Sequence, residues 1–131
     1  MFKHNEHPGR GVLKSDFEAT VRHLEAADSS VQVAVGHAIN LANSIFRSFY
    51  SIGSFQALPM AERVAYIHKL NEMQVKLRDE AQDPVASIGF GLFKMWIAAV
   101  AANDNQLTRD IAAHLAKYSE VGDLSALENA P

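Results

Sequence analysis

Histidines are the first residues of this sequence to consider for chemistry, because imidazole binds metal ions and carries protons near neutral pH. Their spacing contains neither the His-x-x-x-His pair of zinc enzymes nor the Glu-x-x-His pair of di-iron bundles. His68 with Glu72 and Asp110 with His114 are four residues apart, a spacing that is common on helix surfaces. We therefore expect no metal site and no acid–base site. The six histidines are His4, His7, His23, His37, His68 and His114.

The serines also lack the surroundings of a catalytic nucleophile. Such a serine needs a base that a third group orients, and the sequence contains no Gly-x-Ser-x-Gly elbow. Ser51 and Ser54, on either side of Gly53, are better explained as small residues at a helix contact or a helix end. The absence of cysteine excludes disulfides and thiol catalysis. These observations favour a non-catalytic protein without a cofactor.

Two short motifs point weakly to nucleotide or nucleic-acid binding. Gly89-Phe90-Gly91 resembles part of a dinucleotide-binding loop, but that loop requires a strand before its helix. We interpret these glycines as positions where the helix packs against a bulky neighbour. Residues 107–115 have the pattern of the first helix of a helix-turn-helix, but acids follow where a recognition helix needs cations. With a net charge of −3 and no basic segment, we expect no nucleic-acid binding.

Long uncharged stretches are the strongest feature of the sequence. Arg47 is the only charged residue in 31–58, and Lys94 is the only one in 84–102. Other protein surface, a partner or an apolar ligand has to cover such stretches. Residues 85–102 are also long enough to cross a membrane, but Lys94 at their midpoint would cost about 2.5–3.5 kcal/mol. We expect a buried helix there and no membrane insertion.

Periodicity predicts an all-α, single-domain bundle of four to five helices. Capping boxes at Ser15 and Ser29 should start the first two helices, and the second should continue to Ile52. Its apolar stripe should be Val31, Val35, Ala38, Ala42, Ile45, Phe49 and Ile52. Residues 60–81 should form a solvated helix whose charged residues include Arg63. Asp83-Pro84 should start the central, most enclosed helix, and residues 103–105 should cap the last one.

The ends of the chain have no apolar period. We expect an N-terminal arm at residues 1–13, the bundle at 14–122 and a tail at 123–131. The first eleven residues contain no signal-peptide core and no lipidation motif. We therefore expect a cytoplasmic protein, such as a small bacterial or phage regulator, inhibitor, adaptor, chaperone or immunity factor.

The uncharged helical surface favours a protein-interaction module, with a homodimer as its expected form. The polar face of the second helix carries small uncharged residues around Arg47, so this face too should be partly covered. Together with Lys94 it forms the expected partner-binding surface. Its residues are His37, Asn40, Asn43, Ser44, Arg47 and Lys94.

The alternative is a carrier or sensor of a small apolar ligand. Aromatic residues of the second and fourth helices would then line a pocket between those helices. The residues of this expected pocket are Phe46, Phe49, Tyr50, Phe90, Phe93 and Trp96.

Overall fold

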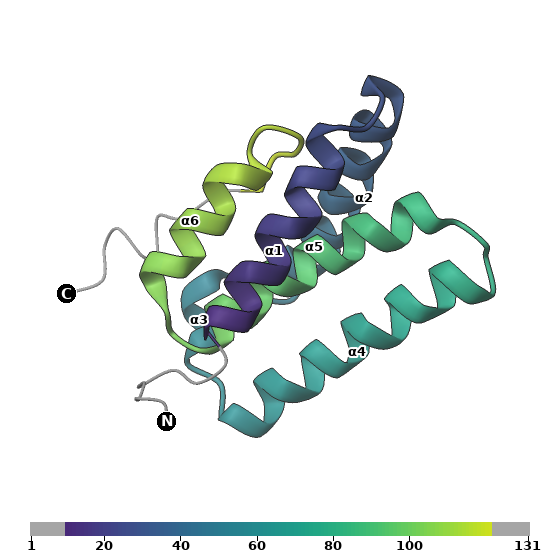
Figure 1. Cartoon of the computed structure of the whole chain (residues 1–131). Coiled ribbons are helices and arrows are strands. Elements are labelled where there is room, and N and C mark those ends of the chain that lie inside the picture. The colour runs from purple at the N-terminus through teal and green to yellow at the C-terminus, as the bar shows by residue number, and fades with distance from the viewer. Residues whose placement is uncertain (1–9, 122–131) are drawn as a thin grey trace.

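The computed structural model describes the backbone of residues 10–121 and the side chains of residues 13–121. Within that range the protein has six helices and no strand, which confirms the all-α bundle (Figure 1). Residues 1–9 of the expected arm and the expected tail at 123–131 lie outside the described residues. The helices are α1 (Arg10–Glu25), α2 (Ser29–Arg47), α3 (Ile52–Gln56), α4 (Met60–Asp79), α5 (Pro84–Ala101) and α6 (Asn105–Leu115).

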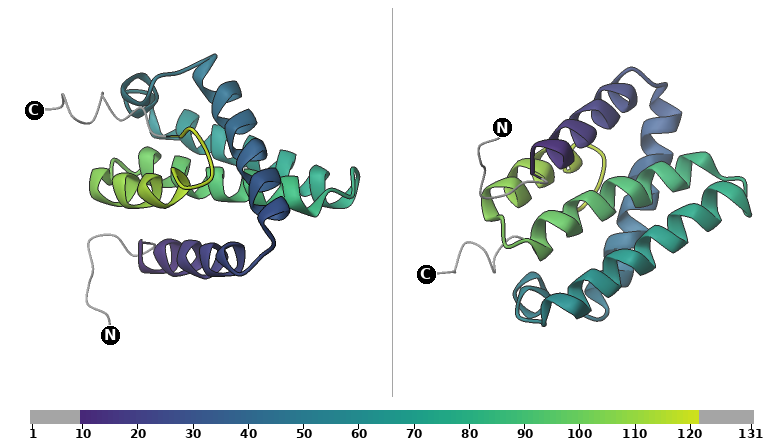
Figure 2. Two further views of the ribbon diagram at one scale, coloured as in Figure 1. Left: turned by 90° about the horizontal axis from the view of Figure 1, so that it is seen from above. Right: turned by 60° about the horizontal axis from the view of Figure 1, so that its bottom comes forward.

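Helix α5 lies at the centre, as its uncharged sequence predicts, and every other helix packs on it. α4 runs back beside α5, and α2 crosses α5 steeply on another side (Figure 2). Leu92, Phe93, Trp96, Ile97 and Val100 have no exposed surface. Among the described helices, α5 alone has the length and hydropathy to cross a membrane, and 61% of it is buried within the bundle.

The second helix is shorter than predicted. α2 ends at Arg47, and α3 begins at Ile52 after a break of four residues. A capping box starts α3: the hydroxyl of Ser51 accepts the backbone N–H of Ser54, and the hydroxyl of Ser54 accepts the backbone N–H of Ser51. The two serines therefore form a helix cap. The break leaves Phe49 70% exposed, so its place in the predicted buried stripe was wrong. The row that α2 buries is Val35, Ala38, Ile39, Ala42 and Phe46.

The caps of the other helices divide into confirmed and wrong predictions. The carboxylates of Asp83 and Asp104 accept the amides of Ala86 and Leu107 at 3.0 and 3.1 Å, which confirms both caps. The boxes at Ser15 and Ser29 are absent. α1 already starts at Arg10, so residues 10–13 of the expected arm are helical. The amide of Gln32 does not close a box, because it donates to the carbonyls at the end of α1, including that of Leu24 at 3.0 Å.

Arg63 is buried, contrary to the prediction that it faces solvent. Only 8% of this residue is exposed, and its Nε donates to the carbonyl of Leu58 at 3.0 Å. Its Nη1 donates to the carbonyl of Ala101, in the last turn of α5. A cation is favourable at this end of a helix because the free carbonyls make it negative. Arg63 thus ties the start of α4 to the end of α5.

The two glycines of Gly89-Phe90-Gly91 allow different helices to pack closely on α5. A Cβ at Gly89 would lie 2.5 Å from the Cβ of Ala38 and 2.9 Å from the carbonyl oxygen of Val35, both on α2. A Cβ at Gly91 would lie 2.6 Å from Nε2 of Gln74 on α4. The interpretation as packing positions is confirmed, although the neighbour of Gly89 is small and not bulky. Phe90 lies between the two contacts and is 3% exposed.

Substituting these glycines by alanine should give unequal losses of stability. Gly89→Ala meets backbone and a fixed Cβ, so we expect the free energy of unfolding to fall by about 1–3 kcal/mol. Gly91→Ala meets only the far end of a flexible glutamine and should lose clearly less. Urea denaturation of both variants measures the difference. Equal losses would show that the contact with α2 is not tighter than that with α4.

Removing the guanidinium of Arg63 should also destabilise the fold. Arg63→Met leaves buried carbonyl oxygens without a donor, and we expect a loss of about 2–3 kcal/mol. Arg78→Met, at an exposed position of the same helix, is the matched control and should leave the urea midpoint nearly unchanged. A midpoint for Arg63→Met equal to that of the control would contradict this account.

Candidate functional site

The described histidines remain apart, on α1, α2, α4 and α6. Among residues 13–121 no group of three or more His, Asp or Glu side chains is placed to hold a metal ion. Oδ1 of Asp110 accepts the side-chain amide of Gln106 at 2.9 Å. His114 packs edge-on against the ring of Phe17, with its Nδ1 buried and without a hydrogen-bond partner. His4 and His7 lie outside the described residues.

The six residues of the expected partner-binding surface do not form one patch. Nε of Arg47 donates to Oδ1 of Asn43 at 3.3 Å, and its guanidinium carbon lies 5.9 Å from the ring centroids of both Phe46 and Trp96. Lys94, on α5, donates from Nζ to Oδ1 of Asn71 at 2.8 Å. These contacts hold Arg47 and Lys94 within the fold, whereas His37 and Ser44 remain exposed.

The polar face of α2 is partly covered by the chain that follows α6. Oδ1 of Asn40 accepts the backbone N–H of Glu120 at 2.6 Å. A Cβ at Gly36 would lie 1.9 Å from the carbonyl oxygen of Tyr118, so only glycine permits this approach. We expected this face to be partly covered, and at Asn40 the covering segment belongs to the same chain.

The expected aromatic pocket is largely filled by its own side chains. Phe46, Phe93 and Trp96 have no exposed surface, and the centroid of the Phe46 ring lies 6.0 and 6.5 Å from those of the other two. Phe49 and Phe90 lie elsewhere, one largely exposed and the other between α2 and α4. The six aromatics thus do not line one cavity, because half of them form the solid core.

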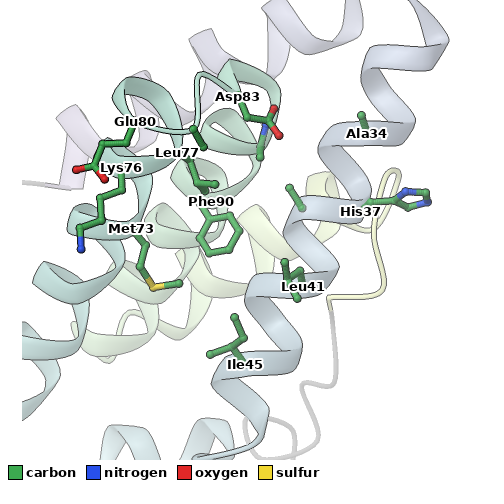
Figure 3. Close-up of a pocket in the computed structure, with 13 residues that line it drawn as sticks. Ala34, His37, Leu41, Ile45, Met73, Lys76, Leu77, Glu80, Asp83 and Phe90 are labelled. Atoms are coloured by element: carbon green, nitrogen blue, oxygen red, sulfur yellow. The ribbon is translucent and has the colours of Figure 1, made fainter.

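A groove does exist, between α2 and α4. Both helices pack on α5, α4 along it and α2 across it, but they make few contacts with each other, so the space between them stays open above Phe90. It has a volume of about 670 Å³. Leu41 and Ile45 of α2 face Met73 of α4 across it (Figure 3). Leu41 is 57% exposed.

The groove continues beyond Ile45 and Met73. The same two residues line a smaller hollow of about 190 Å³, together with Phe49, Tyr50 and Tyr66. From Ala34 to Ile45 the wall formed by α2 is about 17 Å long, at 1.5 Å per residue, and Phe49 extends it beyond the end of the helix. We call the combined space the α2–α4 groove. The α2 wall corresponds to about three helical turns.

The two walls of the α2–α4 groove differ in charge. The α2 wall has no charged residue between Ala34 and Ile45. The α4 wall carries Lys69 and Lys76, followed by Glu80 at one end. Burial raises the pKa of Tyr66 to about 12, with a smaller contribution from Tyr50, so its phenol is neutral at physiological pH.

Sequence reasoning missed the α2–α4 groove. The apolar periodicity places Ile45, Phe49 and Leu77 in buried stripes and places Leu41 in none. The signal was present, because Leu41 and Ile45 are four residues apart on one side of α2, and Phe49 follows at the same spacing just beyond its end. The sequence does not show that α4 leaves this side uncovered.

No protein family, curated protein or solved structure matches this chain. The geometry of the α2–α4 groove therefore carries the functional argument.

The raised pKa of Tyr66 makes stability fall at high pH. The folded chain keeps the phenol protonated up to about pH 12, whereas the unfolded chain releases the proton near the ordinary tyrosine value of 10.0. This contribution is complete below pH 10 and is lost as the pH rises through about 12. Tyr66→Phe should therefore lose less stability across this interval, as measured by urea denaturation. Absorbance at 295 nm should show a late phenolate step that this variant lacks; persistence of that step would contradict the assignment.

Proposed function

We propose that the protein is a non-catalytic protein-interaction module whose α2–α4 groove binds an amphipathic helix of a protein partner. The observation that carries this proposal is the open trough between two helices on an apolar floor. This is the usual receptor geometry for a helix that inserts one apolar face. The length of the groove suits at least about three turns, over which a helix presents several apolar anchors on one face.

The exposed apolar side chains of the walls supply the binding energy in this proposal. Leu41 and Phe49 are 57% and 70% exposed in the unbound chain. Complete burial of such a side chain contributes about 1.5–3 kcal/mol relative to exposure. The uncharged α2 wall loses no charge hydration when a helix covers it.

A second copy of the chain is one source of such a helix. Exposed residues of α2 recur at alternating steps of three and four, and most of them are small, which permits close contact with a two-fold equivalent. These residues are Ala34, His37, Leu41 and Ser44, followed by the C-cap Ser48. Sedimentation of the wild-type protein shows whether it is a dimer, and sedimentation of Leu41→Glu shows whether the dimer uses this face.

A carrier of a small apolar ligand is the second candidate. The volume of about 670 Å³ lies within the range of small-molecule sites, about 300–1,000 Å³. The ligand would lie against Leu41, Met73 and Phe90, and not in the expected aromatic pocket. Native mass spectrometry of the purified protein would show a bound small molecule in this case.

A matched pair of substitutions on α2 tests the role of the α2–α4 groove. Leu41 lines it, whereas Val33, with 56% exposure on the same helix, lies outside it. A displayed library of amphipathic helical peptides should yield binders to the wild-type protein. Leu41→Glu should weaken these at least about tenfold, because a charge replaces an apolar contact. Val33→Glu should leave their affinity unchanged, with the fold of both variants checked by circular dichroism.

The outcomes separate the candidates. Equal loss in both variants would point to general charge effects and would remove the α2–α4 groove as the site. A dimer that Leu41→Glu dissociates would identify a second copy as the occupant. Failure to select any helical binder, together with a small molecule displaced by Leu41→Glu, would replace the proposal with the ligand carrier.

A further inference from the structure

The two lysines on the α4 wall bear on the chemistry of the occupant, and their significance rests on the proposed function of the α2–α4 groove. Lys69 and Lys76 are both exposed and line consecutive parts of it. They are seven residues apart, which is about two helical turns, so they lie on the same side of α4. Lys76 stands on the α4 side of the groove in Figure 3.

Neither lysine is engaged within the described part of the chain. No described carboxylate lies within ion-pair distance of Lys69 or Lys76, and neither ammonium donates a hydrogen bond to a described residue. Glu72 lies between them in sequence but does not line the α2–α4 groove. Both cations are therefore available to a molecule that occupies this space.

The facing wall, formed by α2, has no negative charge to neutralise Lys69 and Lys76. α2 holds no acid, and the side that it turns to the groove is uncharged. A second copy that inserts its own α2 would bring no carboxylate to Lys69 and Lys76. The charges therefore argue against the α2 of a second copy as the occupant and favour a helix that carries carboxylates.

We propose that the partner is an amphipathic helix with an acidic flank. One face carries apolar side chains that contact Leu41, Ile45, Met73 and Phe90. On the adjacent flank, two carboxylates about seven residues apart reach Lys69 and Lys76. The part of the partner helix that lies next to Glu80 and Asp83 carries no carboxylate, because a negative charge there would be repelled by those two residues. The lysines thus give the groove selectivity for charge in addition to its apolar affinity.

Three versions of one designed peptide provide the probe. Each is a helix of about four turns with the same apolar face, and only two flank positions seven residues apart differ, being Glu, Gln or Lys. Fluorescence anisotropy with the full chain should show the Glu peptide binding about 3- to 10-fold more tightly than the Gln peptide, with the Lys peptide weakest. High salt should reduce these differences, because the charges are exposed.

Charge reversal on the protein supplies the decisive comparison. The variant Lys69→Glu with Lys76→Glu should reverse the order, so that the Lys peptide binds best. The control Lys14→Glu with Arg22→Glu makes the same change in net charge on exposed positions of α1 and should keep the wild-type order. An order that both variants reverse would overturn the inference, because net charge would then explain it.

The remaining outcomes distinguish this inference from the proposed function. If all three peptides bind equally and Leu41→Glu abolishes their binding, the α2–α4 groove is a helix site but the acidic flank is refuted. If no peptide binds the wild-type protein, and Leu41→Glu changes neither binding nor sedimentation, the proposed function fails as well. Circular dichroism shows that each variant has folded.

Discussion

The close approach of α2 to α5 at Gly89 is the contact on which the rest of the structure depends. Without a Cβ at this position, the backbone of α2 at Val35 reaches the surface of α5. Two residues later, Gly91 admits Gln74 of α4 on a different side of the same helix. Phe90 stands between the two contacts. Three consecutive residues thus set the two walls and the floor of the α2–α4 groove.

Burial around α5 explains why so much of the chain lacks charge. Trp96 and its neighbours are enclosed on all sides, and the indole N–H donates to the carbonyl of Thr108 on α6 at 3.2 Å. Arg63 brings its cation into this environment, where carbonyl oxygens at the end of α5 accept its hydrogen bonds. The uncharged stretches therefore serve the interior first, and among their large apolar side chains only Val33, Leu41, Phe49 and Ile88 remain exposed.

The sequence predicted what local chemistry determines. The all-α class, the central place of α5 and the caps at Asp83 and Asp104 follow from composition and short-range patterns, and all are confirmed. The end of α2 was missed because Phe49 and Ile52 continue the apolar spacing through a break that Ser51 and Ser54 create. The α2–α4 groove was missed for a different reason. Whether Leu41 is covered depends on the distance between α2 and α4, which both pack on α5. The apolar periodicity of one segment gives no information about that distance.

The contact of Gly36 with Tyr118 has a mechanical consequence. The carbonyl of Tyr118 lies against one side of α2, and Asn40 clamps the next turn of the same helix to Glu120. The opposite side of α2 forms a wall of the α2–α4 groove. The segment after α6 therefore braces α2 from the side opposite to the groove. A side chain larger than hydrogen at position 36 would push this brace away, and the wall would lose its support from behind.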